Sequence, residues 1–253
     1  MYPVSWQLRE LDAVLQCGGL SAKIAFSRPS DGMVNVVVAD HRLGAARLLG
    51  IGVGPAVESQ GTCPIESYVR GPDLAVAYEA SGQWPVRVDA LWRAIAPATP
   101  DKFLAGVDLI VSVRTHLLDA HPNLAVQSVV PASDVFRLAG PCGAACEPLA
   151  LSAAAPTIIG PDNGGGCLLF RLPKVDLTYL EMVHPADFQH DELSGSESGG
   201  PLRIAHRLFR MTLEKGVILR ARIRGVFMNR QQDAEVAAEC YASLAAADPP
   251  LST

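Results

Sequence analysis

Four side chains in the last third of the sequence have the chemistry of proton transfer: Tyr179, Glu181, His184 and His206. In a lyase or an epimerase, a tyrosine or a histidine abstracts the proton next to a carboxylate, and arginine stabilises the negative charge that develops. Tyr179 and Glu181 are two residues apart and share one face of a strand, whereas His184 lies on the other face or in the following loop. No single segment assembles a complete site. We therefore predict these four residues as catalytic candidates that only the fold could bring together.

Arginines are concentrated in residues 203–228. In this segment apolar and polar side chains alternate, as expected for two strands joined by a turn at Gly216. A three-residue loop with Gly216 in the left-handed bulge position collects the apolar side chains on one face of this predicted hairpin and the basic ones on the other. In that register Arg210 faces Arg220 and His206 faces Arg224. Like charges placed directly opposite are unfavourable by up to about 1 kcal/mol per pair.

Two arrangements would neutralise this basic face. Carboxylates on neighbouring strands could pair with it, and the candidates are Asp89, Asp108, Asp176 and Glu181. Alternatively, guanidinium groups could hold an anionic ligand such as a carboxylate, sulfate or phosphate. The ligand-binding candidates are Arg210, Arg220, Arg222 and Arg224.

The stretch from His184 to Glu192 contains two histidines and three carboxylates, a composition that could ligate a divalent ion. Its spacing matches no defined metal motif, and Pro185 prevents a regular helix through His184. The six cysteines are expected to be free thiols, because a chain of this length needs no disulfides to hold a core. They are Cys17, Cys63, Cys142, Cys146, Cys167 and Cys240. The residues point to no particular cofactor.

Composition restricts the class of protein. The chain has 253 residues with 49% hydrophobic and 19% charged residues, enough to bury a large core. Its net charge of −5 argues against nucleic-acid binding, which usually goes with a basic excess. No apolar run is long enough to cross a membrane, and the N-terminus lacks the features of a signal peptide. We expect a cytoplasmic protein that binds neither membranes nor nucleic acids.

The elements that would position these residues are mainly strands. Strand-like segments at 33–39, 66–79, 86–95, 103–115, 124–130, 135–138, 167–172 and 175–184 predict ten or more strands with the two of the hairpin. No βαβ alternation occurs, which favours a large antiparallel β-sandwich. We predict one domain, with an N-terminal helical lead-in at 1–32, the sandwich at 33–229 and a closing helix at 230–246. Residues 189–201 are predicted to form a polar, flexible loop.

Three functions are compatible with this architecture. The first is a carbohydrate-binding or carbohydrate-active β-sandwich that acts on an acidic saccharide through the face bearing arginine and histidine. An aromatic content of only 6% counts against this hypothesis, because sugar-binding sites usually need exposed aromatic rings. Tyr68 and Trp84 are the candidates for contacting a sugar. The second is a non-catalytic module that forms a homo-oligomer through sheet edges or faces. A metal-dependent hydrolase using His184, Asp187 and His190 ranks third.

Overall fold

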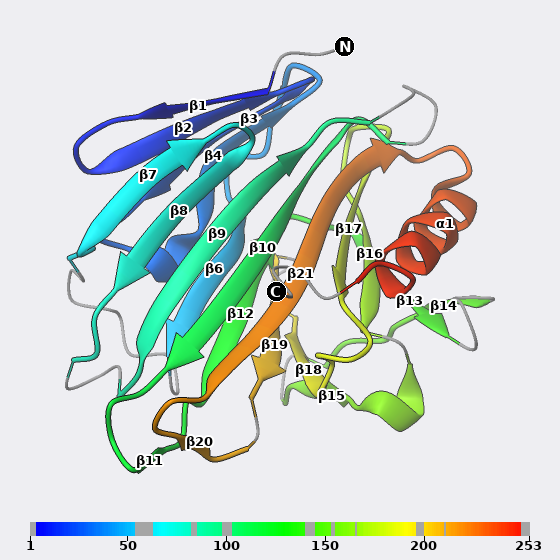
Figure 1. The fold of residues 1–253 in the computed structure, drawn as a ribbon. Coiled ribbons are helices and arrows are strands. Elements are labelled where there is room, and N and C mark those ends of the chain that lie inside the picture. Colours follow the sequence, from blue (N-terminus) through cyan, green and yellow to red (C-terminus); the bar gives the residue numbers. More distant parts are fainter. Residues whose placement is uncertain are drawn as a thin grey trace.

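A computed structural model of the chain describes residues 4–53, 63–81, 85–97, 103–139, 145–152, 155–164, 166–195, 200–209 and 211–248. Within these residues, two twisted antiparallel sheets pack face to face, and an α-helix lies against the outside of one of them (Figure 1). The mainly β architecture with antiparallel sheets confirms the expected sandwich. No helix in the described part of the chain is long and apolar enough to cross a membrane.

The ten-stranded sheet runs in the order β1-β2-β3-β4-β6-β12-β19-β18-β15, with β5 paired to β4. Its strands are β1 (Val4–Leu8), β2 (Asp12–Cys17), β3 (Leu20–Ala25), β4 (Met33–Val38), β5 (His41–Arg42), β6 (Arg47–Val53), β12 (Leu124–Val130), β15 (Thr157–Ile159), β18 (His190–Ser194) and β19 (Leu202–Leu208).

The nine-stranded sheet runs in the order β14-β13-β16-β17-β21-β10-β9-β8-β7. Its strands are β7 (Glu66–Arg70), β8 (Asp73–Tyr78), β9 (Arg87–Ile95), β10 (Ala105–Arg114), β13 (Asp134–Ala139), β14 (Ala145–Pro148), β16 (Cys167–Arg171), β17 (Leu177–Val183) and β21 (Ile218–Asn229). A small pair joins β11 (Asp119–Ala120) to β20 (Leu213–Glu214), and short 3-10 helices span Pro29–Asp31 and Pro161–Asn163.

The main core lies between the two sheets and follows from strand alternation. In β9, Val88, Ala90 and Trp92 are buried while the residues between them are partly exposed, so one face of the strand packs inward. Large aromatic side chains fill the middle of this layer. They are Phe26, Tyr78, Trp92, Phe170, Tyr179 and Phe227.

The predicted N-terminal helix is wrong, because residues 4–25 form the three strands β1, β2 and β3. Ala13, Leu15 and Cys17 are buried and alternate with more exposed residues, which is the period of a strand. The helical spacing depended on Leu8 and Leu11, and these lie exposed at the turn between β1 and β2.

The predicted hairpin over residues 203–228 is also wrong, because β19 and β21 belong to different sheets. β19 pairs with β12 and β18, and β21 pairs with β10 and β17. The chain leaves the ten-stranded sheet at Phe209, whose φ of 58° is in the left-handed region. It then passes through β20 before entering the other sheet. Alternation within a strand shows which residues share a face, but it does not identify the neighbouring strand.

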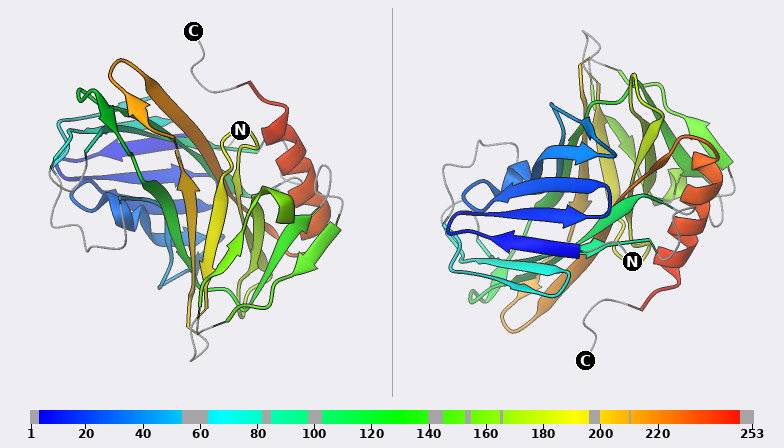
Figure 2. Two further views of the ribbon diagram at one scale, coloured as in Figure 1. Left: turned by 90° about the horizontal axis from the view of Figure 1, so that it is seen from below. Right: turned by 90° about the horizontal axis from the view of Figure 1, so that it is seen from above.

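The closing helix is confirmed as α1 (Asp233–Ala245). It packs Ala237, Tyr241 and Leu244 against Leu180 and Met182 on the outer face of the nine-stranded sheet, in a second apolar cluster separate from the main core. Both views in Figure 2 show the helix at the flank of the sandwich.

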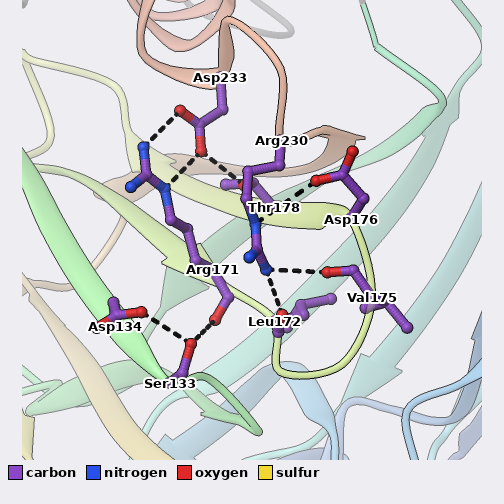
Figure 3. A network of polar contacts seen from close by, with 9 residues as sticks. All are labelled: Ser133, Asp134, Arg171, Leu172, Val175, Asp176, Thr178, Arg230 and Asp233. Carbon is purple, nitrogen blue, oxygen red and sulfur yellow. Dashed lines mark hydrogen bonds and ion pairs between the residues drawn. The ribbon is translucent and has the colours of Figure 1, made fainter.

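The start of α1 is attached to the sheet through Asp233 (Figure 3). Arg171 donates to both carboxylate oxygens, from Nε at 2.9 Å and from Nη2 at 3.0 Å, and the Thr178 hydroxyl donates at 2.8 Å. Arg230, just before the helix, donates to the carbonyl oxygens of Leu172 and Val175. Burial would raise the pKa of Asp233, but the hydrogen bonds from Arg171 and Thr178 outweigh it and hold that pKa below its usual value.

We predict that Asp233→Asn lowers the free energy of unfolding by about 2 kcal/mol, since the buried Asp233 loses its charge and its bidentate ion pair with the partly exposed Arg171. Because the folded-state pKa of Asp233 is lowered, this contribution is fully present above the unfolded-state value of about 4 and is lost as the pH falls through the folded-state value. Urea denaturation of wild type and variant at pH 7 and pH 3 measures both effects. Glu235→Gln, an exposed change in the same first turn, is the control and should alter stability by less than about 0.5 kcal/mol.

Candidate functional site

The structure brings three of the four predicted catalytic residues together in the interior of the sandwich. Tyr179 and Glu181 extend inward from β17, and His206 faces them from β19 in the opposite sheet. The Tyr179 hydroxyl donates to Glu181 Oε2 at 2.6 Å, and His206 Nε2 lies 2.9 Å from Glu181 Oε1. All three side chains are buried, with at most 1% of their surface exposed.

Two residues that the sequence did not single out complete this buried histidine network, which comprises Ser128, Tyr179, Glu181, Asp191 and His206. Asp191 Oδ1 lies 2.6 Å from His206 Nδ1, and the Ser128 hydroxyl donates to Glu181 Oε2 at 2.7 Å. Both ring nitrogens of His206 therefore face carboxylate oxygens. Because an ionised carboxylate only accepts hydrogen bonds, two such partners favour a ring with a proton on each nitrogen and hence a positive charge.

The electrostatics of the network agree with this geometry. Burial alone would lower the pKa of His206, but the charges and hydrogen bonds of Asp191 and Glu181 outweigh it and raise that pKa to about 10. Burial and the adjacent Glu181 carboxylate also raise the pKa of Tyr179 well above its usual value, so the phenol keeps its proton. These groups are held in fixed protonation states near neutral pH.

Gly225 provides the space that the Tyr179 side chain occupies. It lies opposite Glu181 in the pairing of β17 with β21, and a Cβ atom built there would come within 2.5 Å of the Tyr179 hydroxyl oxygen. A larger residue at this position would displace the phenol from Glu181. The small residue on β21 is thus part of what positions the network.

His184 lies apart from the other three candidates. It follows β17 and contacts the end of α1, with Nε2 3.4 Å from the Ala247 carbonyl oxygen. Asp187 accepts a hydrogen bond from the backbone N–H of Arg222, whereas His190 lies on β18 beside Glu192. Among the described residues, no group of three or more His, Cys, Asp or Glu side chains could hold a metal ion, so the metal-hydrolase alternative has no site there.

The described arginines of the predicted basic face have three different kinds of hydrogen-bond acceptor. Arg224 donates to both oxygens of Asp108 at 2.6 and 2.9 Å, while Arg220 Nε donates to the Ser112 hydroxyl at 3.0 Å. Arg222 is buried and donates to the Leu244 carbonyl oxygen at the end of α1. These three side chains lie on the outer face of the nine-stranded sheet, on the opposite side of that sheet from His206.

Arg210 lies outside the described residues, and so does Trp84. Among the carboxylates considered from the sequence, Asp108 pairs with Arg224 and Asp89 pairs with Arg87. Glu181 instead faces the interior. Of the described candidate arginines, Arg224 thus has the carboxylate partner that the first arrangement requires.

An open pocket of about 360 Å³ lies on the outer face of the ten-stranded sheet, at the ends of β12, β18 and β19. We call it the His190 pocket. It is lined by His121, Asn123, His190, Glu192, Arg207, Leu208 and Phe209. It thus combines two imidazoles, a carboxylate, a guanidinium group, an amide and an aromatic ring, the mixture of polar and apolar groups typical of small-molecule sites.

The polar groups of this pocket are held in a defined arrangement. Arg207 donates from Nε and Nη2 to the two oxygens of Glu192, both at 2.9 Å, and His190 Nε2 lies 3.4 Å from Glu192 Oε1. The hydrogen bonds from Arg207 lower the pKa of Glu192, against a smaller opposing effect of burial. Glu192 therefore remains ionised and fixes both neighbours.

Two residues of the pocket have unusual backbone conformations. Asn123 has a φ of 34° and Phe209 a φ of 58°. Side chains other than glycine rarely adopt positive φ, and such residues concentrate at binding and catalytic sites. Both occur where a strand meets its connection, since Asn123 precedes β12 and Phe209 follows β19.

The buried histidine network lies directly behind this pocket. His190 and Glu192 flank Asp191 on β18, and Arg207 follows His206 on β19. Because alternate residues of a strand point to opposite faces, the outward side chains form the pocket while the inward ones form the network. The hydrogen bond between Asp191 and His206 therefore joins the two strands that carry the groups of the pocket.

Sequence reasoning named His190 only as a candidate metal ligand and missed the rest of this site, because it treated residues 189–201 as a flexible loop. The first part of that segment is β18, in which Asp191 and Leu193 are buried and alternate with the partly exposed His190 and Glu192. This short alternation was the available signal. Nothing in the sequence placed His121 beside it.

Comparisons with known proteins give a fold but no family. No protein-family model matches the sequence, and no curated protein sequence is similar to it. Solved structures do match. A proposed aldose 1-epimerase from Escherichia coli K12 aligns with a TM-score of 0.59 at 10% identity, over 90% of this chain and 100% of the other.

Two further structures agree with that match. A galactose mutarotase-like protein from Lactobacillus casei aligns with a TM-score of 0.56 at 8% identity, over 89% of this chain and 100% of the other. Galactose 1-epimerase from Lactobacillus acidophilus aligns with a TM-score of 0.53 at 8% identity, over 90% and 99%. The chain therefore has the galactose mutarotase-like β-sandwich fold.

We predict that the charged ring of His206 stabilises the fold in a pH-dependent way. Its folded-state pKa of about 10 is above the ordinary value of 6.5, so the contribution is full below pH 6.5 and is lost as the pH rises through 10. The free energy of unfolding should thus fall by a few kcal/mol between about pH 7 and pH 10 in the wild type, and much less in His206→Gln. Urea denaturation across this range measures it.

His41→Gln changes an exposed histidine on β5 and should keep the wild-type pH dependence. Nitrogen-15 NMR at pH 8 provides a second test that requires no variant to fold. A neutral His206 ring at that pH would contradict the assignment.

Proposed function

We propose that the protein binds a saccharide in the His190 pocket and interconverts its two anomers. The observation that carries this proposal is the arrangement of His190 beside a Glu192 carboxylate that Arg207 holds in place. The fold supports it, since an aldose 1-epimerase activity is named for structures with this sandwich. A fold alone does not define an activity, so the argument depends on the chemistry of the pocket.

Epimerisation at the anomeric carbon requires two coupled proton transfers. A base removes the proton of the C1 hydroxyl while an acid protonates the ring oxygen, and the bond between C1 and that oxygen breaks to give the open aldehyde. Rotation about the bond between C1 and C2 presents the other face of the carbonyl, and ring closure returns both protons. No electrons are gained or lost, so two proton-transfer groups suffice.

The imidazoles of His121 and His190 are the residues we assign to these transfers. Glu192 is a weak base because its pKa is lowered, whereas imidazole exchanges protons near neutral pH. Asn123 and Arg207 can donate hydrogen bonds to sugar hydroxyls, and the Phe209 ring can contact the C–H face of the sugar. Each group needed for the reaction is therefore present in one pocket.

An acidic saccharide suits the charge of this pocket. Arg207 balances Glu192, and protonation of either histidine would leave the pocket positive. A uronic acid would then gain attraction that a neutral aldose lacks. In this proposal Arg220, Arg222 and Arg224 take no part in binding.

The other catalytic candidates take a different role in this proposal. Tyr179, Glu181 and His206 act as positioning residues that hold β18 and β19 from inside, since buried side chains do not reach a ligand in the pocket. His184 has no part in it. Assembly into homo-oligomers through the sheet edges stays a prediction.

The test is the rate at which α-anomers of D-galactose, D-glucose, D-galacturonate and D-glucuronate reach equilibrium, followed by polarimetry. We expect the wild type to exceed the spontaneous rate for at least one of them, most strongly for a uronic acid. His190→Asn should lose about 100-fold or more of that acceleration, the usual effect of removing a general acid or base.

His41→Asn is the matched control, since it changes an exposed histidine on β5 and should keep full activity. A wild type that accelerates none of the four sugars would refute the proposed activity. An active wild type with an equally active His190→Asn variant would refute the proposed site.

A further inference from the structure

A second hollow lies on the opposite outer face of the sandwich, over the nine-stranded sheet. It encloses about 300 Å³ and spans strands β7, β8, β9, β10 and β21. On β8 the outward side chains are the small Ala75 and Ala77, which lie between larger residues on the strands to either side. We call this hollow the β8 trough.

Strand register arranges the side chains of the trough in rows across the sheet. One row is apolar, and it contains Tyr68, Ala75, Leu91 and Ile110 as directly paired neighbours. The adjacent row is polar, and it contains Glu66, Ala77, Asp89, Ser112 and Arg220. An apolar surface thus runs beside a line of hydrogen-bonding groups.

A third row lies beyond the apolar row and is an alternating charge ladder. It contains Arg70, Asp73, Arg93, Asp108 and Arg224. Arg93 donates to both oxygens of Asp73, and Arg224 donates to both oxygens of Asp108. These guanidinium groups are committed to carboxylates, so this side of the trough offers little attraction to an anion.

The charges that line the trough itself also balance. Arg87 and Arg220 carry two positive charges, and Glu66 and Asp89 carry two negative ones. Arg87 Nε donates to Asp89 Oδ1 at 3.1 Å, which places a donor group and an acceptor group side by side at the edge of the trough. A neutral ligand with hydroxyl groups suits such an edge better than an ion does.

Tyr68 adds an aromatic surface at the β7 end. Its side chain is 49% exposed, although it lies in the row of apolar side chains. Pyranose rings have C–H groups on one face and hydroxyls at the edge, and they pair with an aromatic face beside hydrogen-bonding side chains. Among the described residues that line the trough there is no histidine, the side chain best suited to proton transfer near neutral pH.

We propose that the β8 trough is a binding site for a neutral saccharide, separate from the His190 pocket and without chemistry of its own. Tyr68 contacts the sugar face, Leu91 and Ile110 form the floor, and the Arg87–Asp89 pair binds the hydroxyls. This site is independent of the proposed epimerase activity, since it lies on the other outer face of the sandwich.

Isothermal titration with methyl β-lactoside, methyl β-cellobioside and methyl β-maltoside tests the site, because methyl glycosides cannot open their rings. We expect saturable binding of at least one of them. Tyr68→Ala should weaken that binding about tenfold or more, as expected for the loss of an aromatic contact. Tyr68→Phe should change it by less than about twofold, since the ring is kept.

Ala75→Leu, which fills the floor, should also abolish binding, and Leu118→Ala is the control because Leu118 is 86% exposed and does not line the trough. His190→Asn should leave binding unchanged. The proposal is overturned if none of the three glycosides binds, or if binding survives both Tyr68→Ala and Ala75→Leu. Binding that is lost in His190→Asn but kept in Tyr68→Ala also overturns it, because the sugar then occupies the other pocket.

Sodium galacturonate distinguishes the ligand class. Equal binding of this anion with the same dependence on Tyr68 would overturn the assignment of a neutral ligand. Failure of the trough would leave the anomer-exchange rates unaffected, and failure of the epimerase proposal would leave glycoside binding unaffected.

Discussion

A charged hydrogen-bond chain crosses the otherwise apolar interior of this sandwich. It passes from Asp191 through His206 in one sheet to Glu181 in the other, and Ser128 and Tyr179 satisfy the remaining oxygens of Glu181. Apolar packing tolerates small slips of one sheet over another, but ions buried in an interior of low dielectric do not tolerate losing their partners. We infer that these hydrogen bonds define how the two sheets face each other. They contribute more to the specificity of that packing than to the net free energy of unfolding.

The two outer faces of the sandwich carry their charged side chains in different arrangements. On the nine-stranded sheet, arginines and aspartates alternate across strands, which makes a large basic content nearly neutral. On the ten-stranded sheet, a smaller group of polar residues is concentrated at the ends of three strands, beside two residues with positive φ. In our proposals, proton transfer takes place where the backbone departs from regular sheet, and the regular face only binds a ligand.

The sequence was sufficient to predict the β-sandwich class, the closing helix and most of the central strands. Segments 86–95, 103–115, 124–130 and 175–184 correspond to β9, β10, β12 and β17, because each alternates over many residues. The N-terminal strands were missed because Leu8, Leu11 and Leu15 matched a helical spacing, although Ala13, Leu15 and Cys17 alternate as in a strand. Pairing between distant strands could not be predicted, since it depends on which inner faces fit together and not on any local pattern. Tyr179, Glu181 and His206 were found by residue type, yet their position in the interior could only come from the topology.

The position of β21 has a consequence for how the protein is made. This strand lies in the middle of the nine-stranded sheet, between β10 and β17, and is synthesised after both. Until it emerges from the ribosome, β10 and β17 each have an open edge of unpaired backbone groups, and the inner face of the sheet has a gap at its centre. The emerging chain would then depend on chaperones or on rapid strand insertion to avoid aggregation. Shortening the chain before β21 would remove the central strand of a sheet and not merely an outer one.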